Sequence, residues 1–161
     1  MTLKIGDTIP ETKFHIMTDD GPGQMSTADL LDGKKVVLIG VPGAFTPTCH
    51  ANHLPGFIEN LDAIKAKGID DVAVTTVNDV HVVGAWAKAS NAVGKIHFLA
   101  DGNGDFAKSI GLDVDLGIAG MGVRSKRYAM IIENGVVKEL NVEPAPGQAD
   151  TSSAATILSQ L

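Results

Sequence analysis

The chain has 161 residues, of which 44% are hydrophobic, and a formal net charge of −6. That length suits one domain with a sizeable core, and we expect residues 1–161 to form it. The Lys and Arg residues are dispersed, which argues against nucleic-acid binding. We expect no secretory signal and no membrane span, because the longest aliphatic run covers only residues 36–41. The lone cysteine favours the reducing cytoplasm, although a processed organellar form would leave the same sequence.

The first part of the chain predicts a hairpin, a short helix and a central strand. Turn-forming residues at 19–23 favour the hairpin, and Ser26 or Thr27 can cap the short helix. The expected strands are 13–17, 23–26 and 34–41, and the expected helix ends at Leu31.

A long helix is expected over residues 46–67. Its apolar residues recur three or four positions apart and therefore share one face; they are Leu54, Ile58, Leu61 and Ile64. The Pro55-Gly56 step interrupts this pattern, and we expect a kink there rather than the end of the helix.

Alternating elements continue towards the C-terminus. Asp79 can cap a helix, Asn134-Gly135 is a strong hairpin turn, and residues 151–153 offer caps for a final helix ending at Leu161. The expected strands are 72–77, 96–99, 128–132 and 136–140, and the other helices are 79–92 and 105–110, with an irregular stretch before residue 128. This order favours an α/β, thioredoxin-like fold: a mixed central sheet with helices on both faces and an N-terminal β-hairpin.

The segment that joins the central strand to the long helix carries the chemistry. It contains the pattern Pro-x-x-x-Thr-x-x-Cys, formed by Pro42, Thr46 and Cys49. If Thr46 caps the helix, Cys49 lies in its first turn. Backbone N–H groups there lack partners within the helix and favour an anion such as a thiolate. The thiolate is the nucleophilic form of cysteine.

A positive side chain should add to this effect, because a helix terminus alone supplies only ~0.3–2 kcal/mol. Arg124 and Arg127 are the candidates. The alternative is that Cys49 serves only as a small, buried apolar residue of the core. His50 and His53 follow Cys49 closely, but one Cys with His neighbours is a weak ligand set for zinc, so we expect no metal and no cofactor.

This stretch resembles the peroxiredoxins. Residues 40–49, followed by His-Leu-Pro-Gly-Phe at 53–57, are similar to the type II, peroxiredoxin 5-like branch. Further similarities cover nearly the whole chain and lie at residues 65–68, 77–79, 99–101, 124–128 and 141–144. The resemblance implies a thiol-specific peroxidase that acts on hydrogen peroxide and small alkyl hydroperoxides.

The resemblance also implies roles for individual residues. Cys49 would be the nucleophile that becomes a sulfenic acid, with Thr46 and the Cys49 backbone N–H holding the peroxide. Pro42 would shield the thiolate from water. The family's active-site arginine matches Arg127, which would stabilise the thiolate and the leaving oxygen. The secondary candidates are Arg124 and Thr48.

Regeneration of Cys49 is expected to need a second molecule. By this resemblance, the C-terminal resolving cysteine of some type II members corresponds to Thr151, and another family cysteine, on the second strand, corresponds to Val74. Neither residue can form a disulfide. We therefore expect an external thiol, with glutathione and glutaredoxin favoured over thioredoxin. The resemblance further implies a homodimer whose contact includes residues 78–81, where His81 replaces a common Phe.

Two other functions fit the same fold. A thiol–disulfide oxidoreductase would normally use Cys-x-x-Cys, whereas Thr46 stands three residues before Cys49. A non-catalytic binding or holdase module would leave the Thr-x-x-Cys arrangement without a role. Both alternatives are therefore weaker than the peroxidase prediction.

Overall fold

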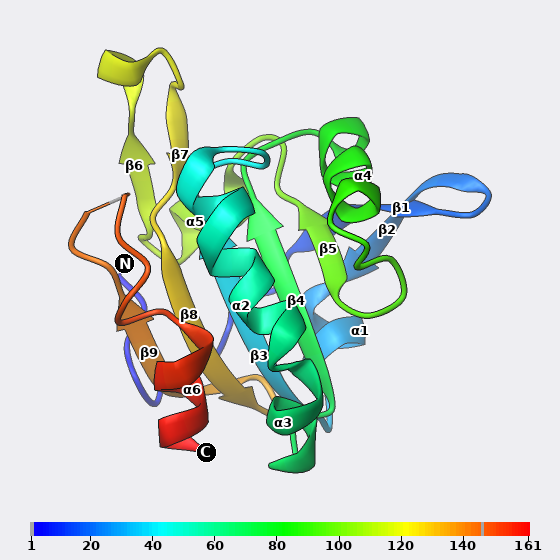
Figure 1. The fold of residues 1–161 in the computed structure, drawn as a ribbon, viewed down its shortest axis with the longest axis vertical. Coiled ribbons are helices and arrows are strands. Elements are labelled where there is room, and N and C mark those ends of the chain that lie inside the picture. Colours follow the sequence, from blue (N-terminus) through cyan, green and yellow to red (C-terminus); the bar gives the residue numbers. More distant parts are fainter. Residues whose placement is uncertain (1, 146) are drawn as a thin grey trace.

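A seven-stranded mixed sheet forms the centre of the molecule (Figure 1). The computed structural model describes residues 2–145 and 147–161. The strand order is β2-β1-β5-β4-β3-β8-β9, in which β3, β4 and β5 are parallel and the outer pairs are antiparallel. The strands are β1 (Lys13–Thr18), β2 (Gly21–Ser26), β3 (Lys35–Val41), β4 (Asp71–Thr76), β5 (His97–Ala100), β8 (Tyr128–Glu133) and β9 (Val136–Val142).

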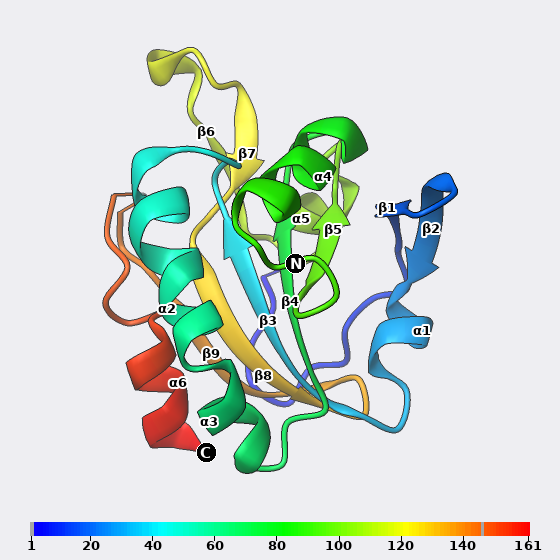
Figure 2. The ribbon, with the colours of Figure 1, turned by 45° about the vertical axis from the view of Figure 1, so that its right-hand side comes forward.

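Helices cover both faces of this sheet, and Figure 2 shows α2, α3 and α6 in front of β3 and β8. Buried residues of α2, α3, α4 and α6 pack on one face, and those of α1 and α5 pack on the other. The predicted mixed sheet between two helical layers is therefore confirmed. The helices are α1 (Thr27–Leu31), α2 (Leu54–Glu59), α3 (Leu61–Ala66), α4 (Val80–Ala89), α5 (Asp105–Ser109) and α6 (Ala154–Gln160).

Local signals set several element ends where the sequence predicted them. The Ser26 hydroxyl accepts from the Asp29 N–H and the Asp29 carboxylate accepts from the Ser26 N–H, which forms a capping box at α1. The Asp79 side chain caps α4. Asn134 and Gly135 both have positive φ, 47° and 80°, as a tight hairpin turn between β8 and β9 requires.

The predicted helix over 46–67 is interrupted twice. Helical conformation begins at Pro47 and passes through a π-helical segment, η1 (Cys49–His53), before α2. Asn60, with φ −99° and ψ 9°, then separates α2 from α3. Pro55 lies in the first turn of α2, where its missing N–H is tolerated, and the helix continues past it to Glu59.

Helix α4 ends at Ala89, short of the predicted end at residue 92. Asn91 has φ 54°, a left-handed conformation through which an α-helix cannot continue. Helix α5 ends at Ser109, one residue before the prediction, and Gly111 follows with φ 71°. Left-handed residues therefore fix both ends.

The stretch that was expected to be irregular contains a two-stranded arm. Strands β6 (Asp113–Asp115) and β7 (Val123–Ser125) pair antiparallel, and the 3₁₀ turn η2 (Gly117–Ala119) joins them. The arm projects away from the sheet in Figures 1 and 2. Its tip residue Ile118 is fully exposed.

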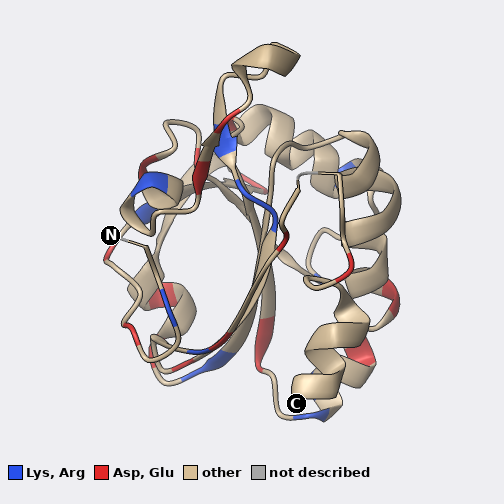
Figure 3. Cartoon of the chain, turned by 90° about the vertical axis from the view of Figure 1, so that its left-hand side faces the viewer, with Lys and Arg blue, Asp and Glu red and all other residues tan. Residues whose placement is uncertain are grey.

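Basic and acidic residues are interspersed along the described chain, and the cartoon in Figure 3 shows no long stretch of one sign. Across the described parts of the chain, none of the helices combines the length and apolar character that a membrane crossing demands.

Candidate active site

Hydrogen bonds hold the loop after β3 in one shape. β3 ends at Val41, at the carboxyl edge of its parallel strands, where open α/β sheets gather reactive groups. The Ala44 N–H donates to Asn78 Oδ1 over 2.9 Å, and the Thr46 hydroxyl donates to the Gly43 carbonyl over 2.7 Å. The loop thus enters the following helix along a fixed path.

Gly43 has no room for a side chain. A Cβ there would lie 2.9 Å from Thr46 Cγ2 and 3.2 Å from Arg124 Nη1. Arg124 itself donates to the carbonyl oxygens of Met121 and Pro42, over 2.8 and 3.3 Å. These contacts support a role for Arg124 in anchoring the arm to the loop.

Cys49 lies in the first turn of the helical segment, the place that the sequence predicted. A wide turn begins at Cys49, because the Leu54 N–H donates to the carbonyl oxygen of Cys49, five residues back. Cys49 is 0% exposed, and among the described residues its backbone N–H has no hydrogen-bond acceptor. Such an N–H group favours negative charge nearby.

Arg127 brings a positive charge to Cys49. Its Nη2 donates to Cys49 Sγ over 2.9 Å, and 2% of the residue is exposed. Arg127 directly precedes β8, which pairs with β3 so that Tyr128 lies opposite Gly40. The sheet therefore brings the guanidinium to the loop and helix that follow β3. A buried charge-assisted contact of this kind favours the thiolate.

His53 is a second partner of Arg127, and sequence reasoning missed it. Arg127 Nη1 lies 3.0 Å from His53 Nδ1, and His53 Nε2 lies 2.9 Å from the carbonyl oxygen of Ser152. Burial lowers the pKa of His53 to about 4, an effect that Arg127 increases and the Ser152 hydrogen bond opposes. The spacing of four residues from Cys49, which sets both on one helical face, was the signal that could have found it.

Glu143 is another buried polar group that the sequence did not single out. Its Oε2 accepts from the N–H and the hydroxyl of Ser152, over 2.7 and 2.6 Å. The Glu143 N–H donates to the carbonyl oxygen of Arg127 over 2.9 Å. The segment before α6 is thereby fixed to the end of β9 and to the residue that contacts Cys49.

The other predicted site residues surround this cluster. Pro42 is buried, whereas Thr46 and Thr48 are partly exposed. The Thr48 hydroxyl donates to the carbonyl oxygen of Gly147 over 3.3 Å. Thr48 therefore contacts the segment that precedes α6, and its supported role is to hold that segment near the helix.

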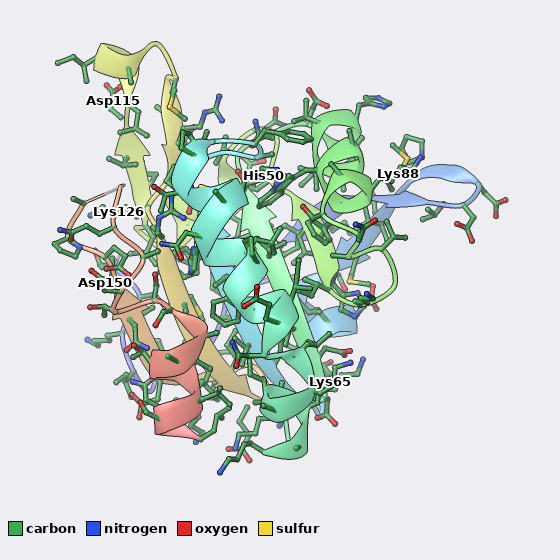
Figure 4. The ribbon with its side chains drawn as sticks, in the orientation of Figure 1. His50, Lys65, Lys88, Asp115, Lys126 and Asp150 are labelled. Carbon is green, nitrogen blue, oxygen red and sulfur yellow. The ribbon has the colours of Figure 1, made fainter. Side chains whose placement is uncertain are left out.

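Trp86 reaches the same helical turn from the opposite side. Its indole N–H donates to His50 Nδ1 over 3.0 Å, and Figure 4 shows His50 between α2 and α4. Trp86 is fully buried and stacks edge-on against Phe98. Within residues 2–145 and 147–161, no group of three or more His, Cys, Asp or Glu side chains is arranged to hold a metal ion.

The sequence and the structure were each compared with known proteins, and both comparisons lead to the same family. Residues 4–158 match the Redoxin family. The chain is 45% identical over 160 residues to Peroxiredoxin-2C of Oryza sativa subsp. japonica, covering 99% of this chain and 98% of that protein. Reduced Prx3 of Vibrio vulnificus, solved in complex with hydrogen peroxide, is 47% identical with a TM-score of 0.93 and 99% coverage of each chain. The 1-Cys peroxiredoxin known as Plasmodium falciparum antioxidant protein is 31% identical with a TM-score of 0.88, covering 96% of this chain and 97% of that one.

A thioredoxin-like fold with a buried thiol at a helix start defines the class of thiol-based redox proteins. Within that class the chain belongs to the peroxiredoxins, which are thiol-dependent peroxidases, and it carries one cysteine. The predicted family and fold are therefore confirmed, and the protein is an enzyme.

Proposed function

We propose that Cys49 is the nucleophile of this peroxidase and that Arg127, Thr46 and Pro42 form its active site. The observation that supports this most is the 2.9 Å contact of Arg127 Nη2 with the sulfur of Cys49, a residue that is fully buried in the first helical turn. A guanidinium and a free backbone N–H together favour the thiolate, which is the form that attacks a peroxide.

In the proposed reaction the thiolate sulfur attacks one peroxide oxygen. A sulfur–oxygen bond forms as the oxygen–oxygen bond breaks, and the other oxygen leaves with the electron pair as hydroxide or alkoxide. Protonation of that oxygen gives water or an alcohol, while the sulfur is oxidised to a sulfenic acid. Arg127 stabilises the negative charge that develops on the leaving oxygen.

Thr46 and the Cys49 backbone orient the peroxide in this proposal. The Thr46 hydroxyl donates its own proton to Gly43, so its lone pairs are available to accept from the peroxide O–H. The Cys49 N–H donates to a peroxide oxygen, and buried Pro42 limits access of water to the sulfur. A fully buried sulfur favours small substrates, and we propose hydrogen peroxide and small alkyl hydroperoxides.

We propose that the sulfenic acid is reduced by thiols from other molecules. Cys49 is the only cysteine of the chain, Val74 is buried inside β4 and Thr151 is exposed. A first thiol attacks the sulfenic sulfur, releases water and forms a mixed disulfide; a second thiol releases Cys49 and leaves as the oxidised disulfide. Glutathione with glutaredoxin is the proposed source, with thioredoxin second.

A homodimer and a cytoplasmic location complete the proposal. The dimer contact would include residues 78–81, beside the loop that Asn78 holds. Phe45 and Ile118 are 46% and 102% exposed, and association would bury such apolar surface. Sedimentation equilibrium at micromolar concentration should give the mass of a dimer; a monomer mass would contradict this part.

Mass spectrometry of the peroxide-treated protein tests the proposed nucleophile. The reduced protein should gain one oxygen atom, and a sulfenic-acid trap should label Cys49. Cys49→Ser should show neither change, and peroxide turnover by that variant would refute the assignment. Peroxide turnover with glutathione and glutaredoxin should then exceed peroxide turnover with thioredoxin. The reverse order would make thioredoxin the main reductant and contradict our preference.

A further inference from the structure

The central sheet opens between β1 and β5. Among the described residues these two strands pair at one position, His15 opposite Ala100, whereas β4 pairs along the whole of β5. Figure 2 shows the β1–β2 hairpin lying apart from β5. Paired strands lie ~4.7–4.9 Å apart, so strands that no longer pair leave space between them.

A cavity of about 570 Å³ lies at this opening. Its apolar lining comes from both sides of the sheet, with Ile16 and Met25 from one core and Val83, Ala87, Ile96 and Phe98 from the other. Met17 and Val93 also line it and are 36% and 62% exposed, so part of the apolar lining faces solvent. The volume falls within the ~300–1,000 Å³ of small-molecule binding sites.

Three exposed lysines line the same cavity, and they are Lys65, Lys88 and Lys95. Figure 4 labels two of them, Lys65 on α3 and Lys88 on α4. Across residues 2–145 and 147–161, none of the three forms an ion pair with a carboxylate. Their ammonium groups are therefore available to a ligand, and their long apolar stems can pack along its chain.

The acidic residues of the cavity do not balance these lysines. The Asp71 carboxylate already has partners in the protein, because its Oδ2 lies 3.5 Å from Lys34 Nζ and its Oδ1 lies 3.3 Å from His97 Nε2. Asp19 lies in the exposed turn between β1 and β2. Positive charge is in excess around an apolar space, which favours a ligand with an apolar chain and a negative head.

We propose that this cavity binds an aliphatic carboxylate, with its chain between β1 and β5 and its head group at the lysines. The inference is independent of the proposed peroxidase site, because the residues that line the cavity include neither Cys49 nor Arg127. It assigns a second binding site to the chain.

Isothermal titration calorimetry with three eight-carbon probes tests the ligand class. Octanoate should bind the full-length protein saturably, with one molecule per chain. Octanol has the same chain without the charge and should bind more weakly, and octyltrimethylammonium should bind weakest of the three. Absence of saturable octanoate binding, or equal affinity for the three probes, would overturn the proposal.

A pair of lysine substitutions tests the head-group contact. Lys88→Gln combined with Lys95→Gln should weaken octanoate binding by ~2–10-fold, as for loss of two exposed ion pairs, and should leave octanol binding unchanged. Lys138→Gln, on β9, is the matched control and should bind octanoate as the wild type does. An unchanged octanoate affinity in the double variant would contradict the assigned head-group position.

Two alanines of α4 test where the chain lies. Ala87 lines the cavity, whereas Ala85 is exposed on the same helix and does not. Ala87→Leu should weaken octanoate and octanol alike by ~10-fold, the loss expected when about two CH₂ groups lose their place. Ala85→Leu should bind both as the wild type does. Equal binding by the two variants would place the ligand elsewhere; if circular dichroism showed Ala87→Leu unfolded, the probe series and the lysine variants would decide.

Two further measurements exclude other occupants. Cys49→Ser should bind octanoate with wild-type affinity, and loss of binding would place the ligand at the thiol and overturn the proposal. Sedimentation equilibrium should give the same mass with and without octanoate. A mass that falls as octanoate is added would show that a second copy of this chain covers the cavity, which would also overturn it.

Discussion

Arg127 and Lys126 are sequence neighbours in opposite environments: Arg127 is buried against Cys49, and Lys126 is exposed. Arg127→Gln removes the charge at the sulfur and should slow oxidation of Cys49 by ~10²–10³-fold in stopped-flow experiments. Lys126→Gln makes the same chemical change one residue away and should leave the rate close to that of the wild type. Equal slowing by both substitutions would mean that the net charge near the site sets the oxidation rate, and not the contact of Arg127 with the Cys49 sulfur.

Thr46 can be tested with two substitutions of opposite character. Thr46→Val keeps the shape and removes the hydroxyl, so it should slow oxidation by ~10–100-fold, as for loss of a hydrogen bond in a charged site. Thr46→Ser keeps the hydroxyl and should restore most of the rate. Second-order rate constants for oxidation by hydrogen peroxide provide the comparison. If the Thr46→Val variant reacted as fast as the Thr46→Ser variant, the proposed role of Thr46 would be wrong.

The sequence predicted some of the site but not its deeper contacts. Pro42, Thr46 and Cys49 lie within one short segment, so their association is local and a motif reveals it. Arg127 and His53 are 74 positions apart, and only the pairing of β3 with β8 brings them together. Glu143 acts through Ser152, and neither residue has a sequence pattern that marks such a contact.

Among the structural elements, strands and caps were predicted better than helix interiors. Hairpin turns and caps depend on particular residues, such as Asn134-Gly135 and Asp79, and these are visible in the sequence. The apolar pattern that predicted the long helix begins at Leu54, after the π-helical segment, so it gave no sign of the wide turn there. The arm was missed as well, because β6 and β7 have three residues each and three glycines lie between them.

The packing of β3 against β8 gives a prediction about stability. A Cβ on Gly40 would lie 2.1 Å from the ring of Tyr128, which is 1% exposed. Gly40→Ala should therefore lower the free energy of unfolding by ~1–3 kcal/mol or more. Gly56→Ala, inside helix α2, is the matched control, because the nearest heavy atom to a Cβ at that position lies 4.0 Å away. It should raise stability by ~0.5–1 kcal/mol in chemical denaturation. A neutral effect of Gly40→Ala would contradict the packing described.

At the scale of the whole molecule, burial of His53 links stability to pH. Its pKa is about 4 in the folded protein, whereas an exposed histidine of the unfolded chain has the ordinary pKa of 6.5. Between these values the unfolded chain binds the proton more readily, so the free energy of unfolding should fall as the pH decreases from 6.5 to about 4. The contribution of His53 to this loss is about 3 kcal/mol.

Urea denaturation across this pH range provides the measurement. The wild type should lose stability more steeply than His53→Asn, which has no titrating group at that position. Parallel curves for the two proteins would show that His53 does not carry the predicted pH dependence.

The fold brings three distant parts of the chain to one edge of the sheet: the loop after β3, the start of β8 and the segment before α6. Together they bury the Cys49 sulfur beside a positive charge, and this arrangement is the physical basis of the proposed peroxide chemistry. The direct test is the second-order rate constant of the reduced wild-type protein with hydrogen peroxide at neutral pH, with free cysteine measured alongside. Our account predicts that Cys49 reacts faster than free cysteine by orders of magnitude; a rate no greater than that of free cysteine would contradict it.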